Sequence, residues 1–128
     1  MPNDRITAPG LAAPPDYAHA VRSGSLVHTA GAVPVDEDGN LVGEGDPVAQ
    51  ARRVLANLEE QLAAAGATPA DVVKTVVYVV ADGHEDLPAV WEVVRASPFS
   101  GAASTLLGVS MLGYTGQLVE IEAVAVLD

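Results

Sequence analysis

The feature that most constrains the fold is the run VVKTVVYVV, from Val72 to Val80, in which β-branched residues occupy most positions. β-Branched side chains have restricted χ1 angles and favour extended backbone. A strand that is apolar at nearly every position is typical of a sheet lying between other layers. The run therefore predicts a strand buried on both faces, and Lys74 is its single charged residue.

A long amphipathic helix is expected before this strand. Asp46 and Pro47 indicate its start, because an Asp side chain at the cap accepts backbone N–H bonds and proline lacks a donor that the first turn does not need. Apolar residues then recur at spacings of three and four until Gly66. They are Val48, Ala51, Leu55, Leu58, Leu62 and Ala65. The opposite, polar face carries Gln50, Arg53, Asn57, Glu60 and Gln61.

The other expected elements are shorter. Residues 1–16 contain four prolines and are interpreted as an extended lead-in. Strands are expected at residues 17–21, 26–35, 104–109 and 117–127, with a return strand beginning at 41–42, and a short helix at 87–94. This order predicts one α+β domain spanning residues 1–128, in which a single mixed β-sheet is backed by two α-helices.

Composition limits the possible partners. The chain has 128 residues, with 17 acidic and 6 basic side chains, and its formal net charge is −11. An excess of carboxylates repels phosphate backbones, so we expect no nucleic-acid partner. Neither a signal-peptide pattern nor an apolar run long enough to span a membrane is present. We therefore expect a cytoplasmic protein with no membrane partner.

The absence of cysteine excludes disulfides, thiolate metal sites and cysteine nucleophiles. Aromatic residues make up only 4% of the chain, so its core must be built from Val, Leu, Ile and Ala. A chain this short with few large side chains is a candidate for burial against a partner subunit.

Two carboxylates stand out in the last predicted strand. Strand alternation places Glu120 and Glu122 on one face with apolar neighbours. Their Cα atoms would be roughly 7 Å apart, close enough to hold a water or to act as an acid and a base. The alternative is that the strand is a sheet edge, where solvated carboxylates discourage aggregation. Spacing alone leaves both readings open.

Histidine and tyrosine give weaker indications. His28 lies in the strand predicted at residues 26–35 and could be a base or a ligand. A hydrogen-bonded structural role is favoured, because His19 and His84 do not lie at ligand spacing from it. We expect neither a metal site nor a cofactor. Tyr17 is either a packing residue or the wall of a pocket, and spacing does not choose between them.

Segments along nearly the whole chain resemble one known family. They are Tyr17, LVHTAG at 26–31, VPV at 33–35, AQARRVLANL at 49–58, AAGA at 64–67, DVVKTVVYV at 71–79 and VEIEAVA at 119–125. Together they resemble the Rid family (RidA/YjgF), deaminases that hydrolyse reactive enamines and imines. The resemblance implies a homotrimer with a barrel-like core and ligand clefts between neighbouring subunits.

The resemblance also implies site residues, and the chain departs from the family at one of them. Active members carry an arginine that grips the substrate carboxylate. Ala103 stands in its place, within GAAST at residues 101–105. Glu120, which would orient the attacking water, and Tyr17 are retained. Trp91 replaces an asparagine and the loop at 112–116 is longer, which suggests a more apolar or reshaped cleft.

The resulting hypothesis is a Rid-type enzyme acting on an imine, an enamine or a related reactive intermediate. Glu120 would activate water or relay a proton in a cleft between subunits, and 2-aminoacrylate is not expected as its substrate. The ligand-binding residues would be Tyr17, Gly31, Ala32, Trp91, Ala103 and Ser104.

Several alternatives remain open. The chain could be a non-catalytic ligand-binding or regulatory homologue, or an auxiliary cyclase or hydrolase of a biosynthetic pathway. The missing arginine could be replaced by Arg22, by His28 or by a residue of a neighbouring subunit. Ribonuclease activity is disfavoured because the chain is acidic and lacks the catalytic cations.

Overall fold

The computed structural model describes residues 3–128, so the first two residues of the lead-in lie outside it. The strands are β1 (Asp4–Ile6), β2 (Ala20–Ser23), β3 (Leu26–Thr29), β4 (Val72–Val80), β5 (Ala103–Val109) and β6 (Val119–Val126). The helices are α1 (Pro47–Ala64) and α2 (Asp86–Arg95), with a 3₁₀ turn at Pro69–Asp71.

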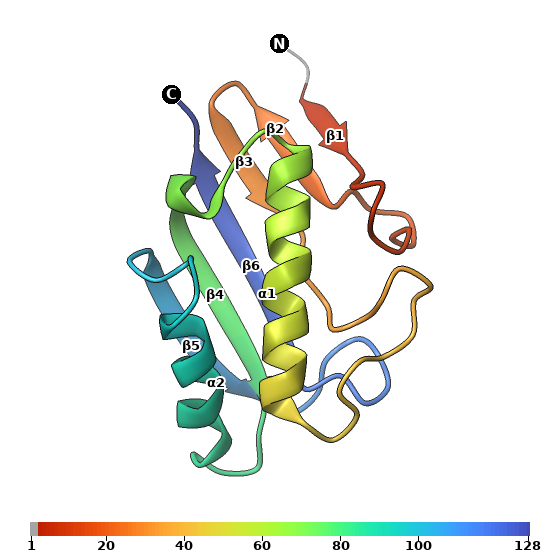
Figure 1. Cartoon of the computed structure of the whole chain (residues 1–128), viewed down its shortest axis with the longest axis vertical. Coiled ribbons are helices and arrows are strands. Elements are labelled where there is room, and N and C mark those ends of the chain that lie inside the picture. Colours follow the sequence, from red (N-terminus) through yellow and green to blue (C-terminus); the bar gives the residue numbers. More distant parts are fainter. Residues whose placement is uncertain (1–2) are drawn as a thin grey trace.

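One sheet contains all six strands, in the order β1-β2-β3-β6-β4-β5. Its neighbours are antiparallel except for the parallel pair β4 and β5. Both helices lie against the same face of the sheet (Figure 1). The predicted α+β class, with a single mixed sheet and two helices, is confirmed.

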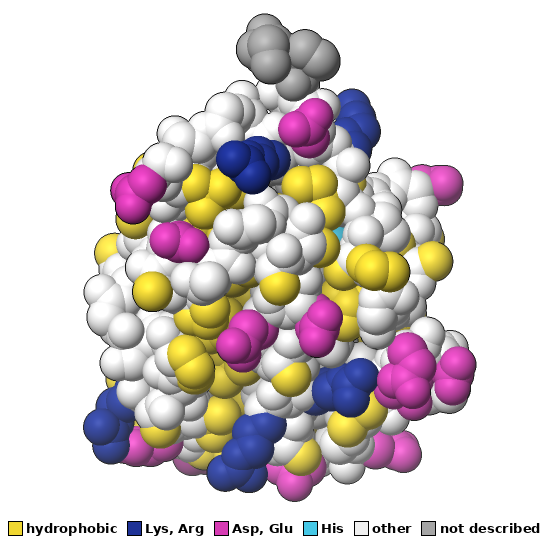
Figure 2. Space-filling view, turned by 45° about the horizontal axis from the view of Figure 1, so that its top comes forward, with side chains coloured by type: hydrophobic (Ala, Val, Ile, Leu, Met, Phe, Trp, Pro, Cys, Tyr) yellow, Lys and Arg dark blue, Asp and Glu magenta, His cyan; other side chains and the backbone are white. Residues whose placement is uncertain are grey.

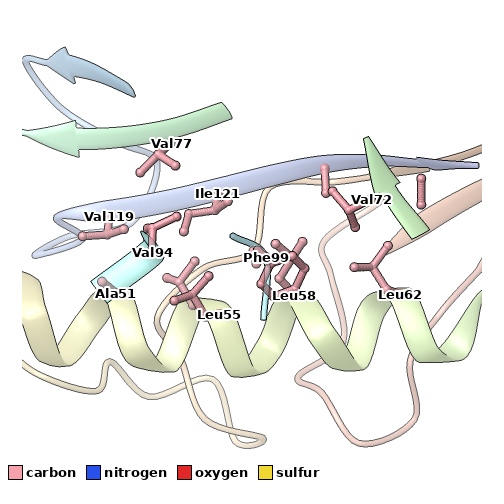
Figure 3. Packing of buried hydrophobic residues seen from close by; sticks show 14 of the residues in the cluster. Ala51, Leu55, Leu58, Leu62, Val72, Val77, Val94, Phe99, Val119 and Ile121 are labelled. Carbon is pink, nitrogen blue, oxygen red and sulfur yellow. The ribbon is translucent and has the colours of Figure 1, made fainter. Parts of the chain in front are cut away.

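Helix α1 forms as the sequence predicts and supplies much of the core. The Oδ1 atom of Asp46 accepts hydrogen bonds from the backbone N–H groups of residues 48 and 49, each at 3.1 Å. Leu58 and Leu62 are fully buried and point from the helix toward β6 (Figure 3). Each buried leucine contributes about 2 kcal/mol through removal of apolar surface from water. Ile121 of β6 belongs to the same buried cluster.

The polar face of α1 departs from expectation, because three of its residues are buried rather than solvated. Gln50, Asn57 and Gln61 expose 0%, 5% and 3% of their surface. Their amides bind backbone carbonyls of the loops that cross this side of the helix. The loops need these partners, since a buried carbonyl without a donor is costly.

Strand β4 is buried on one face only, which corrects the expectation of burial on both. Thr75, Val77 and Val79 are buried against the helices, whereas Val76 and Tyr78 between them are half-buried. The physical reason is that α1 and α2 share one side of the sheet, and within residues 3–128 no further layer covers the other side. We call this second side the open face.

The N-terminal strands are shorter than predicted or shifted. The strand expected at 17–21 lies at 20–23, and the one expected at 26–35 ends at Thr29. Beyond it only isolated bridges remain, Ala32 with Ile121 and the 35–41 pair. Pro34 cannot donate to a ladder, which limits pairing here. The lead-in also contains β1, which was not predicted.

Strand β6 is central, so the edge-strand interpretation of Glu120 and Glu122 is wrong. It pairs with β3 on one side and β4 on the other. The predicted alternation holds, because Val119 and Ile121 are buried while the two glutamates lie on the open face. A central strand has no edge to protect, so its carboxylates need another explanation.

Charged side chains are dispersed over the surface. Figure 2 shows Asp and Glu spread across one side of the molecule, with the basic side chains there lying apart from one another. Within the described residues, no helix combines the length and the apolar character needed to cross a membrane.

Candidate functional site

A cavity of about 280 Å³ lies between the lead-in and the segment that follows β3. Residues 11–15 form one wall, and Gly31, Val33 and Val35 form another. Tyr17 and Tyr114 line it as well. The cavity therefore brings together two predicted ligand-binding residues, Tyr17 and Gly31, with a tyrosine from the long loop before β6.

The backbone around Gly31 is fixed from both sides. Gln61 Nε2 of α1 donates to the carbonyl of Ala30 at 3.2 Å. Ala32 exchanges two backbone hydrogen bonds with Ile121, at 2.7 and 3.3 Å. Ala32 itself is buried in the core, so it supports this wall rather than lining the cavity. The turn at Gly31 is thus held between α1 and β6.

The absence of a side chain at Gly31 leaves room for the Glu120 side chain to lie against it. A Cβ added to Gly31 would stand 2.7 Å from Glu120 Cγ and would overlap the carboxylate. The Oε1 atom of Glu120 accepts a hydrogen bond from Gln117 Nε2 at 3.0 Å. No other donor within residues 3–128 reaches this carboxylate, so Oε2 lies beside Gly31 with no protein partner.

Gln117 and Tyr114 form a connection to Glu120 that the sequence did not reveal. Gln117 is 3% exposed, and its Oε1 atom accepts the backbone N–H of Tyr114 at 3.1 Å. Its Nε2 atom donates to Val119 O at 3.1 Å as well as to Glu120. All of the hydrogen-bonding groups of the amide are engaged, so the loop and the carboxylate are held together. The unusual length of this loop was the only signal.

Tyr17 sits at the mouth of the cavity on a constrained backbone. The preceding residue, Asp16, has a φ of 60°, the left-handed conformation that Asp tolerates better than most residues. Burial raises the pKa of Tyr17 to about 12, with further contributions from a hydrogen bond with Tyr114 and from the charge of Glu120. The Tyr17 hydroxyl therefore stays protonated near neutral pH.

The two glutamates of β6 have different partners. The hydroxyl of Tyr78 donates to Oε1 of Glu122. This hydrogen bond is the largest cause, ahead of burial, of a Tyr78 pKa raised to about 12. Each glutamate thus has its Oε1 atom hydrogen-bonded, and the two differ in position: Glu122 lies beside Tyr78, whereas Glu120 lies against Gly31 of the cavity wall. Of the two carboxylates, Glu120 is the better candidate for chemistry.

Ala103 and Ser104 lie away from this cavity. Ala103 pairs with Lys74 at the start of β4, whereas Glu120 pairs with Tyr78 four residues further along. That separation is about 13 Å along the strand. The Ser104 hydroxyl accepts from Thr75 Oγ1 at 2.9 Å. A single chain therefore does not bring positions 103 and 104 to Glu120.

The remaining predicted residues also lie elsewhere. Trp91, on α2, packs against the core on the helix-covered side, opposite the face that carries Glu120. Arg22 donates to the carbonyl of Ala65 at 3.3 Å, at the end of α1. His28 is exposed on the open face. Within one chain neither Arg22 nor His28 lines the cavity.

A buried histidine fixes the lead-in that forms the cavity wall. His19 Nδ1 accepts the backbone N–H of Ala8 at 2.9 Å, and Nε2 lies 3.1 Å from the carbonyl of Ala12. This pattern requires the neutral ring with its proton on Nε2. Burial lowers the pKa of His19 accordingly. His19 therefore has a structural role.

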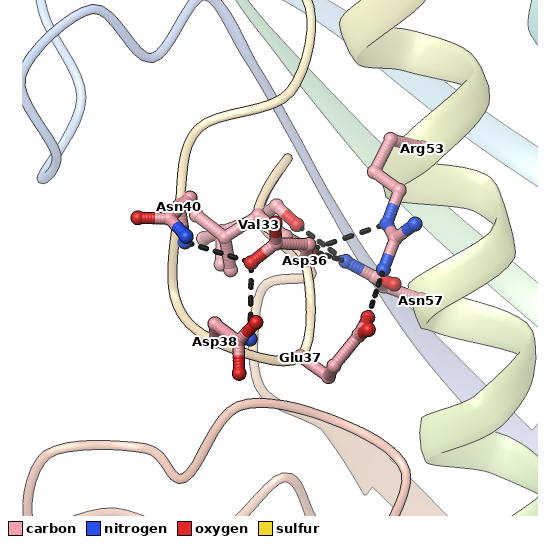
Figure 4. A network of polar contacts seen from close by, with 8 residues as sticks. Val33, Asp36, Glu37, Asp38, Asn40, Arg53 and Asn57 are labelled. Atoms are coloured by element: carbon pink, nitrogen blue, oxygen red, sulfur yellow. Dashed lines mark hydrogen bonds and ion pairs between the residues drawn. The ribbon is translucent and has the colours of Figure 1, made fainter.

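Helix α1 also holds the wall on the far side of Gly31 (Figure 4). Asn57 Nδ2 donates to Val33 O at 2.8 Å and to Val35 O at 2.9 Å. The next turn is closed by Asp36, whose Oδ1 atom accepts from two backbone N–H groups. The hydrogen bond from the backbone N–H of Asn40 is the largest cause of a lowered pKa of the Asp36 carboxyl. The cavity walls are thus tied to the longest helix.

Within residues 3–128, no group of three His, Asp or Glu side chains is arranged to hold a metal ion. The arrangement that remains is a small cavity with tyrosine walls, a tight backbone turn and an adjacent carboxylate. Such a site suits binding of a small molecule and proton transfer to or from it.

The fold and this site define a small α+β protein with a ligand cavity beside a carboxylate on the central strand. Residues 7–127 match the family model described as endoribonuclease L-PSP. The chain therefore belongs to this family, which is also called the YjgF/RidA family, and the resemblance seen in its sequence is confirmed.

Individual relatives agree with this assignment. The 3-aminoacrylate deaminase RutC of Acinetobacter baylyi is 32% identical over 94 residues, covering 73% of each chain. The chain spans about half the length of other curated relatives, such as a RutC family protein of Pyrococcus abyssi, 36% identical over 49% of this chain and 50% of that one.

A crystal structure of Escherichia coli TdcF with bound serine superimposes with a TM-score of 0.83. Its sequence identity is 27%, and the match covers 98% of this chain and 99% of that one.

Proposed function

We propose that this protein is a Rid-type enzyme that hydrolyses an imine, an enamine or a related reactive intermediate. The observation that carries the proposal is the Glu120 carboxylate, whose Oε2 atom lies beside Gly31 with no protein donor among the described residues. An unpaired carboxylate oxygen next to a residue of the cavity wall is positioned to accept a proton from a bound water. Relatives named as deaminases of 3-aminoacrylate and of 2-iminobutanoate support the reaction class.

The proposed reaction adds one water to the C=N bond. Glu120 Oε2 takes a proton from water as the water oxygen bonds to the imine carbon, and the carboxylic acid so formed returns this proton to the nitrogen. Glu120 then takes the remaining proton from the new hydroxyl group and delivers it to the leaving nitrogen. The tetrahedral intermediate then breaks its C–N bond to give a carbonyl compound and ammonia. Gln117 would hold the carboxylate in place through its bond to Oε1. Tyr17, protonated near neutral pH, would be available as a hydrogen-bond donor.

We further propose that the substrate differs from the carboxylated imines of other members. Ala103 offers no donor to a carboxylate. The loss of a bidentate arginine clamp removes both orientation and binding energy for such a substrate. Lys74 is the basic residue that pairs directly with Ala103, and its ammonium already donates to Thr105 Oγ1 at 2.7 Å.

The active unit in this proposal is a homotrimer with the cleft between subunits. The support is the open face of the sheet, which leaves Leu26, Leu107 and Val126 between 38% and 45% exposed. Burial of such a face against another copy removes apolar surface from water. Light scattering at micromolar concentration tests this: a trimer mass supports the cleft and a monomer mass contradicts it.

An assay with 2-aminoacrylate generated in situ tests the substrate argument. We expect pyruvate to form at the rate seen in buffer with the unmodified protein, and to form faster with Ala103→Arg. Rapid pyruvate formation by the unmodified protein, abolished by Glu120→Gln, would show that another cation replaces the arginine. In that case the carboxylate argument fails while the catalytic role of Glu120 stands.

A second candidate function follows from the presence of Ala103 in place of the family's arginine. Without a substrate clamp the chain could act as a ligand-binding or regulatory homologue with no turnover, or as an auxiliary cyclase or hydrolase of a biosynthetic pathway. Ligand binding that persists in Glu120→Gln, together with no turnover of any imine, would favour the binding role. In each case we propose a cytoplasmic protein with a small-molecule ligand and no nucleic-acid partner.

A further inference from the structure

The walls of the cavity contain no positively charged side chain among the described residues. They are built from apolar residues of the lead-in, the turn at Gly31, two tyrosines, the neutral His19 and two amides of α1. Arg53 approaches only from outside, where it donates to Val35 O at 3.2 Å and lies 3.7 Å from Glu37 Oε2. An anion would therefore find no counter-charge in these walls.

The charge that adjoins the cavity is negative. Glu120 does not line the cavity itself, but its side chain lies against Gly31, which is part of the wall, and its charge contributes to the raised pKa of Tyr17. The Oε1 atom is occupied by Gln117, which turns the remaining lone pairs of Oε2 toward Gly31. Glu120 is partly buried, and a partly buried carboxylate attracts a cation more strongly than one in bulk solvent.

Two tyrosine rings also line the cavity. Tyr17 and Tyr114 come from segments almost a hundred residues apart, yet both line the cavity. Their side chains remain 43% and 40% exposed, so neither ring is buried in the core. Tyrosine faces attract ammonium groups through the ring quadrupole.

We propose that this cavity binds a protonated nitrogen, an ammonium or iminium group, carried on an apolar body about the size of one substituted ring. Glu120 Oε2 would pair with the nitrogen, while Tyr17 and Tyr114 would contact its apolar substituents. A cavity of about 150 Å³ can hold a benzene, so 280 Å³ leaves room for the ring and the charged group. The inference deepens the proposed function and rests on it for the iminium form.

The test compares three probes of similar shape: benzylammonium, benzyl alcohol and benzoate. Affinities are measured by calorimetry or amide chemical shifts at pH 7.5, in low and in moderate salt. We expect benzylammonium to bind about tenfold more tightly than benzyl alcohol, because a partly exposed ion pair retains only part of its Coulomb energy. Benzoate should bind more weakly than either.

Matched variants separate the site from the overall negative charge of the protein. Glu120→Gln should abolish the preference for benzylammonium, whereas Glu59→Gln, which removes a charge from an exposed position on α1, should leave it. Tyr114→Phe should retain binding and Tyr114→Leu should weaken it, since only the second removes the ring. Thermal melts of all variants confirm that they are folded.

The outcomes keep this inference apart from the proposed function. Equal or tighter binding of benzoate, no binding of any probe, or a preference that survives Glu120→Gln would overturn the cation site. If the preference is present but no imine is hydrolysed, the cation site stands and the proposed enzymatic function fails. If an imine is hydrolysed but the protein shows no preference for a cation, the enzymatic function stands and the cation site fails.

Discussion

Replacement of Asn57 by leucine tests the claim that α1 holds the cavity wall. Leucine keeps the branching of asparagine at Cγ but cannot donate, so Asn57→Leu leaves the carbonyls of Val33 and Val35 without their donors at 2.8 and 2.9 Å. An unsatisfied buried carbonyl costs about 1–3 kcal/mol. One of these bonds is only partly buried, so we expect a total loss of about 2–3 kcal/mol in the free energy of unfolding.

Urea denaturation followed by circular dichroism measures this loss, at one fixed protein concentration because association would add to stability. Glu59→Leu is the control, since it adds leucine at an exposed position of the same helix and should change stability by no more than about 0.5 kcal/mol. A loss for Asn57→Leu as small as that of the control would refute the claim.

Three further predictions concern other contacts of the site. His19 has a lowered pKa, so it binds a proton less readily when folded than when unfolded. The contribution of His19 to stability is therefore complete above pH 6.5 and falls as the pH drops toward its folded pKa. Urea titrations from pH 8 to 5 should show a smaller fall in the free energy of unfolding for His19→Gln than for the unmodified protein. Gly31→Ala should displace the Glu120 side chain and reduce benzylammonium affinity to the level of Glu120→Gln, with the fold intact by thermal melting. Tyr78→Phe removes the donor to Glu122, so it should lower the free energy of unfolding by about 1–2 kcal/mol while probe affinity is unchanged; a loss of affinity would mean that the two glutamates act together.

Local pattern was sufficient to predict both helices and the strands β4, β5 and β6, but not β1 or the bounds of β2 and β3. Helix α1 follows from the cap at Asp46 and the spacing of its leucines, and the orientation of Glu120 follows from strand alternation. The same patterns misjudged Asn57, because a polar residue on a helix is scored as exposed even when loop carbonyls require its donor. Where Pro34 interrupts pairing, propensity overestimated the length of β3.

The candidate site was predicted only in part, because some of its residues lie in an irregular loop. Tyr17 and Gly31 line one cavity of the chain, and Glu120 lies against Gly31. Gln117 and Tyr114 belong to an irregular loop, whose path no periodicity describes. Positions 103 and 104 lie far along the sheet, so any contribution from them would have to come from another copy of the chain.

The central claim is that Glu120 promotes hydrolysis of an imine that carries no carboxylate. The most direct measurement follows benzaldehyde formation from its imine, which an amine oxidase releases from benzylamine, with and without this protein. The account predicts a rate above that in buffer for the unmodified protein and for Glu59→Gln, and a return to the buffer rate for Glu120→Gln. A Glu120→Gln variant that hydrolyses the imine as fast as the unmodified protein would contradict it.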